Sequence, residues 1–402
     1  MVQILAAIFA VLLGSVLMKL GNAMLSLTVT LTLNQNGTSL EVIGLVSAAF
    51  SGGFLLGGFY ARRMIGAVGH VRALSLTTAV AAIATLAFPL VLDGAVWAGL
   101  RAIYGFTGAV AYIVFESWLN ERATPDTRGR VLGVYATANY FALTLGQLLI
   151  NTTPLGGGLA FSLCAVLLLA GLMPVVATSL PQPELKAAQR LSARQLYRES
   201  PLAVVTVTGG GLMSGGLFGM VAVFAQDIGL PLLRVTLLTG AYVFGAFLLM
   251  WMIGRFSDKF GRRAALALAL GMVVALSAVM ALSGELAIGF WGLVAIALVL
   301  GANMLSIYHS AVAHAYDRLP KEHYVAASGS FQIFFSVGSI GGPIITGFLM
   351  ERLGPYSLWA YSAAIAALLL AFVAYRWIVR PAVTVEVDAP STQPAPQQVV
   401  SN

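Results

Sequence analysis

Charged side chains are scarce in this chain of 402 residues, because only 9% are Asp, Glu, Lys or Arg, whereas 59% are hydrophobic. A soluble globular domain carries roughly 25% charged residues. The scarcity of charge therefore excludes an ordinary water-soluble domain. Cysteine is equally rare, since Cys164 is the single one, so the chain can form neither an internal disulfide nor a cysteine-based metal cluster.

Several motifs that carry catalytic chemistry are also missing. The sequence has no glycine-rich phosphate loop of the Walker type, which argues against ATP-driven transport within this chain. It has no His, Cys and carboxylate set at metal-ligand spacing, and no nucleophile elbow. We therefore expect no enzymatic activity, no metal and no cofactor. The first residues lack the basic segment and cleavage site of a signal peptide, so we expect them to begin the first membrane span.

Long apolar runs are what the sequence does contain, and runs of 18 or more residues recur from end to end. Each is long enough to cross a bilayer as a helix. They predict an all-α membrane protein with twelve transmembrane helices. The expected spans are 4–32, 41–61, 72–92, 95–119, 130–151, 156–178, 201–226, 233–255, 264–282, 285–313, 324–350 and 355–379.

The polar stretches between these runs divide the chain into four parts. The longest internal one, 180–200, is interpreted as a cytoplasmic linker between an N-terminal half, 1–179, and a C-terminal half, 201–380. The tail 381–402 is rich in Pro, Gln, Ser and Val, so we expect it to be a disordered cytoplasmic tail.

Basic residues are distributed unevenly between the two sets of loops. Of the 22 Lys and Arg residues, 18 lie after even-numbered spans or in the C-terminal flank, whereas only Arg234 and Arg352 lie in the opposite loops. Basic residues accumulate in cytoplasmic loops, so both termini are predicted to be cytoplasmic. The same placement explains the net charge of +7 without a nucleic-acid partner.

The two halves share an internal repeat. When the first half is shifted by 196 residues, six identities fall in three corresponding spans. The pairs are Gly44 with Gly240, Gly58 with Gly254, Gly105 with Gly301, Tyr112 with Tyr308, Gly133 with Gly329 and Gly146 with Gly342. Two parallel six-helix halves around a midplane site are an architecture of secondary transporters.

Two motifs resemble those of the major facilitator superfamily. The segment GRFSDKFGRR (254–263) resembles its loop signature, and WAGLRAIYGFTGA (97–109) resembles its fourth-helix motif. In several members the Arg of that motif, here Arg101, is associated with proton coupling. The resemblance covers residues 1–380 and implies the twelve-helix fold and a secondary transporter that moves a small solute by alternating access, with protons as the coupling ion.

Two further stretches, FESWLNERATPDTRGRVLGVY (115–135) and VAHAYDRLP (312–320), resemble a bacterial subfamily of inner-membrane transporters. They imply a multi-pass protein of the bacterial inner membrane, which we expect to be monomeric in the lipid bilayer. The alternatives are a non-transporting scaffold or sensor on the same fold, and an uncoupled facilitator. Substrate and direction of transport stay open.

The sequence departs from the family pattern at three places. Arg62 stands where the signature of the first-half loop places Asp, and that loop is longer; Tyr104 stands where Gln is common. The fifth-helix Gly-Pro motif of drug antiporters is absent because Gln147 follows Gly146, although Gly-Gly-Pro occurs at 341–343. The missing Gly-Pro motif weakens the case for drug–proton antiport, which stays open as an alternative.

Charges near the cytoplasmic ends of spans predict two latches. The repeat aligns Arg62 with Asp258, and in this fold each of these loops faces a helix start of the other half. The predicted gating residues are Arg62, Arg128, Arg130, Asp258, Arg262, Asp317 and Glu322. In one latch, Asp258 is predicted to pair with Arg128 and Arg130. In the other, Arg62 is predicted to pair with Asp317 and Glu322. Both latches are predicted to hold the outward-open state. The alternative is that these charges only enforce topology.

Three ionisable residues, Lys19, Arg101 and Glu116, lie inside predicted spans of the first half. Charges at such depth are costly and usually face a cavity. Arg101 is the predicted coupling or substrate residue, and Glu116 with Asn120 is predicted to carry protons at the inner gate. Lys19 is predicted to line the substrate cavity, where an anionic or zwitterionic group would suit it. There are alternatives without a transport role. Arg101 could bond neighbouring backbone carbonyls, Glu116 could bind residues of the fifth span, and the Lys19 side chain could extend outward to the membrane surface.

The second half offers one more titratable candidate, because His314 precedes Asp317 by three residues and shares its helical face. A histidine can titrate near neutral pH, so His314 is a predicted proton relay, with a structural hydrogen bond as the alternative. The remaining predicted cavity residues are Asn22, Tyr112, Tyr308 and Gln332. The two tyrosines could equally be packing aromatics.

Overall fold

The computed structural model describes residues 2–122, 128–155, 157–178, 182–183, 192–320 and 323–379. The described part of the chain is helical and contains no strand. Its helices are α1 (Val2–Gln35), α2 (Leu40–Val68), α3 (His70–Ala87), α4 (Gly94–Arg122), α5 (Arg128–Leu149), α6 (Gly158–Val176), α7 (Ala193–Glu199), α8 (Pro201–Asp227), α9 (Leu232–Phe260), α10 (Arg262–Ala281), α11 (Phe290–Tyr316), α12 (Tyr324–Leu353) and α13 (Ser357–Val379). Two short 3-10 turns, η1 (Phe88–Leu90) and η2 (Ile150–Thr152), follow α3 and α5.

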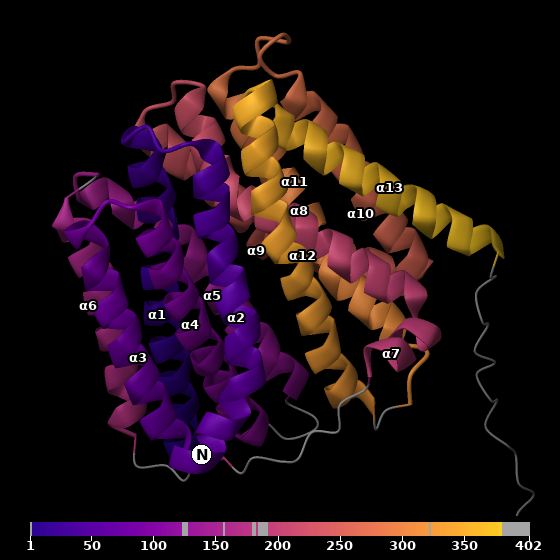
Figure 1. Cartoon of the computed structure of the whole chain (residues 1–402). Helices are drawn as coiled ribbons and strands as arrows, with labels where there is room; N and C mark the ends of the chain where they lie inside the picture. The colour runs from indigo at the N-terminus through magenta and orange to yellow at the C-terminus, as the bar shows by residue number, and fades with distance from the viewer. Residues whose placement is uncertain are drawn as a thin grey trace, which may run out of the picture.

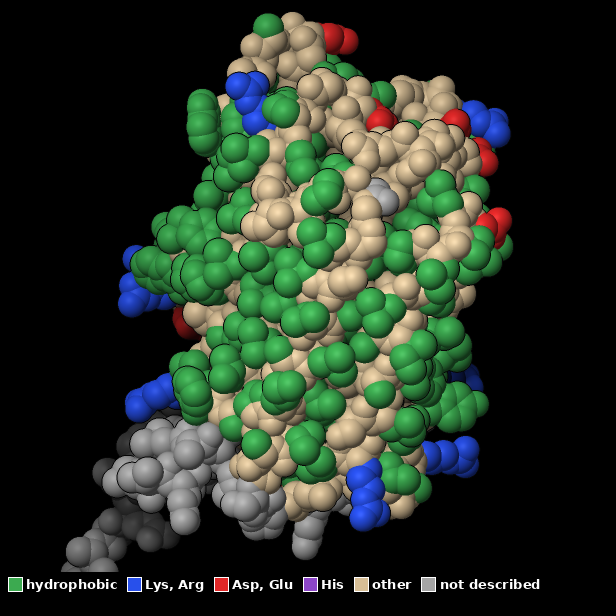
Figure 2. Space-filling model, turned by 90° about the vertical axis from the view of Figure 1, so that its left-hand side faces the viewer, with side chains coloured by type: hydrophobic (Ala, Val, Ile, Leu, Met, Phe, Trp, Pro, Cys, Tyr) green, Lys and Arg blue, Asp and Glu red, His purple; other side chains and the backbone are tan. Residues whose placement is uncertain are grey.

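Eleven of the described helices are long and apolar enough to cross a membrane. The remaining long helix, α5, has 22 residues and carries Asn139 and Gln147 on buried positions, between α1 and α9. The outer surface is apolar, as Ile83 of α3 is 68% exposed and Met173 of α6 is 69% exposed. Figure 2 shows hydrophobic side chains over the middle of one face and charged side chains toward its ends and edges. The predicted all-α membrane fold is confirmed.

The long helices form two bundles of six, α1–α6 and α8–α13 (Figure 1). In the first bundle α2 packs against α4 and α1 against α6; in the second, the equivalent pairs are α9 with α11 and α8 with α13. Equivalent glycines allow the close contacts. A Cβ on Gly53 would lie 1.9 Å from the carbonyl oxygen of Ala102, and one on Gly245 would lie 1.8 Å from that of Leu298. The two halves therefore repeat one packing scheme.

The packing also corrects the predicted register of the repeat. Gly53 and Gly245 differ by 192 residues, as do the turn glycines Gly69 and Gly261, which have φ of 84° and 90°. The partners Ala102 and Leu298 differ by 196. Thus α2 and α9 align at 192, whereas α4 and α11 align at 196, because α10 is longer than α3 and the α10–α11 connection is longer than the α3–α4 connection.

Three consequences follow for the predicted pairs. Gly105 and Gly301 are confirmed as equivalent, because they meet Phe50 and Tyr242, which are 192 apart. The pairs Gly44 with Gly240 and Gly58 with Gly254 are wrong by one helical turn. The alignment of Arg62 with Asp258 is wrong for the same reason: Asp258 corresponds to Gly66, and Arg62 corresponds to Gly254. The loop of the first half is therefore not longer than its counterpart, and it carries no charge at the Asp position of the signature.

Two ends of the molecule are distinguished below. The far end carries the α1–α2, α8–α9 and α12–α13 turns, and the terminal end carries the start of α1 and the α2–α3 and α9–α10 turns (top and bottom of the first half in Figure 1). Helix α7 occupies part of the predicted linker 180–200 and is capped by Ser192, whose Oγ accepts from the Gln195 amide at 3.2 Å. The rest of that linker, apart from residues 182–183, 192 and 200, and the predicted tail 381–402 lie outside the described residues.

Candidate functional site

A cavity of about 70 Å³ lies inside the N-terminal half. Such a volume holds several water molecules or a small ligand. Its walls come from α1 to α6: Ser15, Met18, Lys19, Asn22, Phe50, Phe54, Thr77, Thr78, Ala81, Tyr104, Thr107, Gly108, Ala111, Tyr112, Phe115, Tyr135 and Leu168. The structure thus brings together three predicted cavity residues, Lys19, Asn22 and Tyr112.

Lys19 lies midway along α1 and is partly buried against the cavity. Within the described chain, no hydrogen bond or ion pair joins its ammonium to another residue. Ser15, Lys19, Asn22 and Ser26 follow one another at spacings of four, three and four residues, so they lie on one face of the helix. This polar stripe leads from the cavity toward the far end.

Arg101 lies where the stripe ends and is only 5% exposed. Its Nη2 atom donates to Ser26 Oγ over a long 3.4 Å, and its guanidinium stacks over the ring of Phe50 at 4.8 Å from the centroid. Its Nε and Nη1 atoms have no hydrogen-bond partner. A buried guanidinium with two unsatisfied donors is costly. Within the described residues, the Arg101 guanidinium therefore does not make the structural hydrogen bonds to backbone carbonyls that were the alternative to a coupling role.

Glu116 lies one helical turn from the cavity, on the terminal side. The Tyr112 hydroxyl, which lines the cavity, donates to Glu116 Oε1 at 2.5 Å. The Asn120 Nδ2 atom donates to the backbone carbonyl of Glu116 at 2.8 Å, so its amide braces the helix and does not reach the cavity lining. Along α4, Glu116 is about 22 Å from Arg101 at 1.5 Å per residue, which separates the carboxylate from the buried cation.

The candidates of the second half lie elsewhere. Tyr308 makes edge contacts with Phe335 at 5.3 Å and with His309 at 5.4 Å, and Gln332 is partly buried on α12. Neither lines the cavity of the first half. His314 is 6% exposed and its Nε2 atom has no partner. Among the described residues, the charged groups that act on it are Arg318, Arg263 and Arg376, and none of these is a carboxylate.

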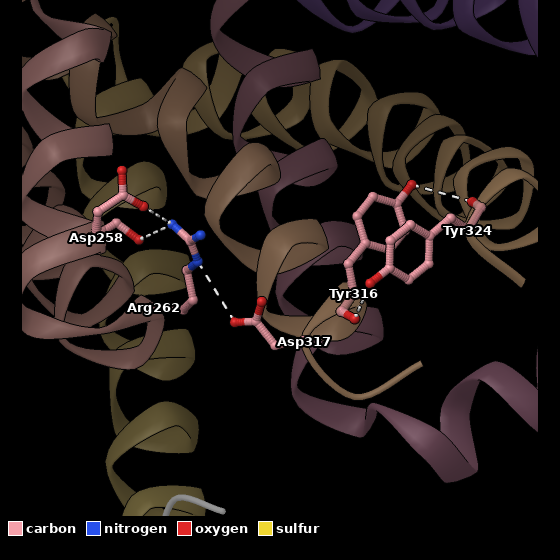
Figure 3. Close-up of polar contacts among 6 residues, drawn as sticks. Asp258, Arg262, Tyr316, Asp317 and Tyr324 are labelled. Atoms are coloured by element: carbon pink, nitrogen blue, oxygen red, sulfur yellow. Dashed lines mark hydrogen bonds and ion pairs between the residues drawn. The ribbon is translucent and has the colours of Figure 1, made fainter. Parts of the chain in front are cut away.

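The signature segment 254–263 forms an ion-pair chain within the second half (Figure 3). Arg262 Nη1 contacts Asp258 Oδ1 at 2.7 Å and Ser257 Oγ at 3.0 Å, while its Nε lies 3.6 Å from Asp317 Oδ2. Because the Asp258 and Arg262 side chains are 69% and 32% exposed, this pair is worth about 0–1 kcal/mol. Arg262 thus contacts Asp258 on its own helix and Asp317 at the end of α11.

Two tyrosines hold the loop that carries Asp317. The Tyr324 hydroxyl donates to the Tyr316 carbonyl at 2.9 Å, and the Tyr316 hydroxyl donates to the Tyr324 carbonyl at 3.3 Å. Their rings stack with centroids 4.5 Å apart (Figure 3). This tyrosine clasp joins the end of α11 to the start of α12. It was not predicted from the sequence, although the flanking motif VAHAYDRLP was noticed.

Among the described residues, no ion pair joins the two halves at the terminal end, where the latches were predicted. Arg62 on α2 and Arg130 on α5 are exposed, and no ion pair joins either of them to a described residue. The side chain of Arg128 and the whole of Glu322 lie outside the described residues. Both latches therefore stay predictions for another conformation.

Polar contacts do join the halves at the far end, and these were not predicted. Asn34 Nδ2 of α1 donates to Gln226 Oε1 at 3.0 Å and to Asp227 Oδ1 at 2.8 Å on α8. Asn151 of η2 donates to Thr236 Oγ1 of α9 at 2.8 Å. These residues stand singly at span ends and belong to no periodic pattern, so only their position beside predicted turns pointed to them.

Helices α2 and α12 complete the far-end contact. The Leu40 amide donates to Glu351 Oε2 at 2.6 Å, and Arg352 Nη2 lies 3.5 Å from Glu41 Oε1. Deeper in, a Cβ on Gly44 would lie 2.3 Å from the carbonyl oxygen of Pro343. The Gly-Gly-Pro segment 341–343 also meets α8, since a Cβ on Gly342 would lie 2.2 Å from the Leu212 oxygen. The motif therefore lies where three helices cross.

Contacts between the halves are thus one-sided. Among described residues, the hydrogen bonds and ion pairs that join the halves lie at the far end, whereas the charges at the terminal end are paired within the second half.

Comparisons with known proteins agree with this architecture. The sequence matches the family described as the Major Facilitator Superfamily over residues 11–302 and 210–401. It is 27% identical over 361 residues to the uncharacterised MFS-type transporter YcaD of Salmonella arizonae, which covers 89% of this chain and 92% of that protein.

Two solved structures are similar in fold. A bacterial homologue of the human lysosomal transporter Spinster, inward-facing and unoccupied, has a TM-score of 0.68 at 16% identity, covering 94% of this chain and 95% of that one. A D-xylose–proton symporter has a TM-score of 0.70 at 15% identity, covering 92% and 97%. At these identities the likeness concerns the fold alone.

Proposed function

Because the chain belongs to the major facilitator superfamily of membrane transporters, we propose that it moves a small solute across the bacterial inner membrane by alternating access. Its fold and relatives are those of transporters and not of enzymes. In this proposal it acts as a monomer, and the terminal end faces the cytoplasm. The excess of Lys and Arg in the loops of that end supports the orientation.

The observation that carries the proposal is the one-sided contact between the halves. Bonds such as Asn34 to Asp227 hold the far end together, whereas Asp258 is bound to Arg262 of its own half. In this proposal it is the arrangement of an inward-open state. The outward-open state would exchange the two sets of contacts, with Asp258 turning to Arg128 and Arg130. Exposed pairs bias a population by small amounts, which suits a switch.

Proton coupling is proposed for Glu116. Its carboxylate is joined to the cavity through Tyr112, so a change in its protonation changes a group on the cavity wall. When Glu116 is protonated, its Oε1 can still accept from Tyr112, but the negative charge beside the cavity is gone. Arg101, whose role in coupling is implied by the family resemblance, would supply fixed positive charge at the other end of the same helix.

Proteoliposomes with a proton gradient test the proposal. Uptake of a mixed metabolite pool is measured by mass spectrometry, and proton flux is measured with an internal pH dye. Glu116→Gln preserves the acceptor for Tyr112 but removes the titratable carboxyl, so gradient-driven uptake should fall at least tenfold while solute exchange persists. Glu285→Gln, an exposed site in the α10–α11 connection, is the matched control and should keep full uptake.

The alternative functions give different results in the same vesicles. An uncoupled facilitator would equilibrate a solute at the same rate with and without the gradient. A scaffold or sensor would move neither solute nor protons for any compound of the pool, and that outcome would refute transport.

A further inference from the structure

We infer that the cavity in the N-terminal half binds an amphipathic organic anion, with one carboxylate and an aromatic or branched apolar body, and that compounds of this class are the transported solutes. The second part rests on the proposed transport function, whereas the binding site stands on the cavity alone. Lys19, Asn22 and Arg101 carry the argument for negative charge, and the aromatic walls carry the argument for the body of the ligand.

The charge of the site is the first step. Two cations lie along the polar stripe of α1, Lys19 on the cavity wall and Arg101 at the stripe's end through Ser26. Within the described residues neither forms an ion pair with a carboxylate. A buried cation is stable when a negative group neutralises it. The carboxylate of Glu116 already accepts a hydrogen bond from Tyr112, and it lies about 22 Å from Arg101 along α4. A cationic ligand would meet repulsion here, and an anionic one would supply the missing charge.

The hydrogen-bond donors left to a ligand are the second step. The hydroxyls of Ser15, Thr77 and Thr107 donate to backbone carbonyls of their own helices at 2.8–2.9 Å, so their protons are used. Lys19 and Asn22 make no such bond and lie three residues apart on one face. An ammonium beside an amide is a suitable pair of donors for one carboxylate, whose strong bonds are charge-assisted. The hydroxyls of Thr78 and Tyr104 also lie on the wall, and no hydrogen bond within the described residues uses their protons.

The apolar walls are the third step. Six aromatic side chains line the cavity: Phe50, Phe54, Tyr104, Tyr112, Phe115 and Tyr135. Aromatic rings favour offset or edge contacts with another ring and bury much apolar surface. Small-molecule sites are commonly apolar with a few placed polar groups. A ligand with its carboxylate at Lys19 and its apolar body among these rings satisfies both parts of the wall.

Binding to purified protein in nanodiscs tests the inference by calorimetry. The probes are phenylacetate, cinnamate, naphthoate and octanoate, each with its neutral amide, and phenethylamine as the cation. At least one carboxylate should bind tenfold or more tightly than its amide, and the amine should not bind. Lys19→Gln should abolish the preference, Lys19→Arg should keep most of it, and Arg234→Gln, an exposed far-end cation, should leave it unchanged.

Three results would overturn the inference: no carboxylate binds, an amide or the amine binds as tightly as its carboxylate, or a folded Lys19→Gln variant keeps the preference. Retention of a single symmetric peak in size exclusion identifies the folded variants. Uptake of the same probes in proteoliposomes separates the two claims. Transport of other solutes without carboxylate binding refutes the anion site and leaves transport standing, whereas carboxylate binding without any flux supports the site and refutes transport.

Discussion

The closed far end depends on a glycine, and Gly44→Ala should open it. The added Cβ would lie 2.3 Å from the carbonyl oxygen of Pro343 and 3.1 Å from its carbonyl carbon, closer than real contacts allow. These are backbone atoms, so no side-chain rotation relieves the clash. Helices α2 and α12 must instead move apart by roughly 1 Å to restore an ordinary contact.

The magnitude follows from the place of the clash. Overpacking costs about 1–3 kcal/mol. Because Gly44 and Pro343 belong to different halves, the cost falls on the state in which the far end is closed, and not on the folding of either half. At about 1.4 kcal/mol per tenfold, the closed state should lose roughly five- to 150-fold against a state in which the far end is open.

Cysteine labelling measures this shift. Cys164 is buried and is replaced by Ser, and Ser47→Cys on α2 serves as reporter because Ser47 is 9% exposed and faces Gly219 of α8. An impermeant maleimide applied to whole cells should label the reporter at least five times faster with Gly44→Ala. The matched control is Gly52→Ala on the same helix, where an added Cβ meets nothing within 4 Å. Equal rates in both variants would refute the account of far-end closure.

Three other changes have defined outcomes. Gly105→Ala should lower the thermal midpoint in a tryptophan-fluorescence melt, since its Cβ would lie 2.0 Å from the Phe50 oxygen, whereas Gly99→Ala on the same helix should not. Tyr324→Phe removes the 2.9 Å bond to the Tyr316 carbonyl and should cost about 0.5–1.5 kcal/mol in a denaturant titration; an unchanged midpoint would show that the clasp contributes nothing. Asp258→Arg should abolish uptake, and adding Arg128→Asp and Arg130→Asp should restore part of it; a dead triple variant would count against the second-half latch.

The apolar runs predicted nearly all of the fold, because helix formation in a bilayer is forced by composition and length. Composition predicts a membrane span least clearly for α5, because this helix carries the polar residues Asn139 and Gln147. Both are buried between other helices and not exposed to lipid. The register of the repeat could not be read from identities alone. Glycines are so common, 43 in all, that a shift of one turn still gave matches, and only the packing of Gly53 and Gly245 distinguished 192 from 196.

The sequence predicted site residues whose own polarity is unusual in an apolar span. It did not predict residues whose role depends on a contact between two helices. Lys19 and Asn22 stood out as polar groups in an apolar run, and the structure places both on the cavity. Thr77 of α3 and Asn34 with Asp227 gave no such signal, since their roles come from neighbours distant in sequence. The prediction of two latches with opposite polarity relied on the alignment of Arg62 with Asp258, which the turn glycines overturn.

Alternating access itself is tested most directly by spin-label distances at the two ends of the protein. One pair joins Ala67 of α2 to Phe260 of α9 at the terminal end, and the other joins Asn36 to Leu233 at the far end; all four side chains are exposed. Double electron–electron resonance in proteoliposomes should show two distances for each pair. Acidification or added solute should shorten the terminal distance and lengthen the far-end distance together. A single distance at each end, unchanged by pH and by every solute of the pool, would contradict the account.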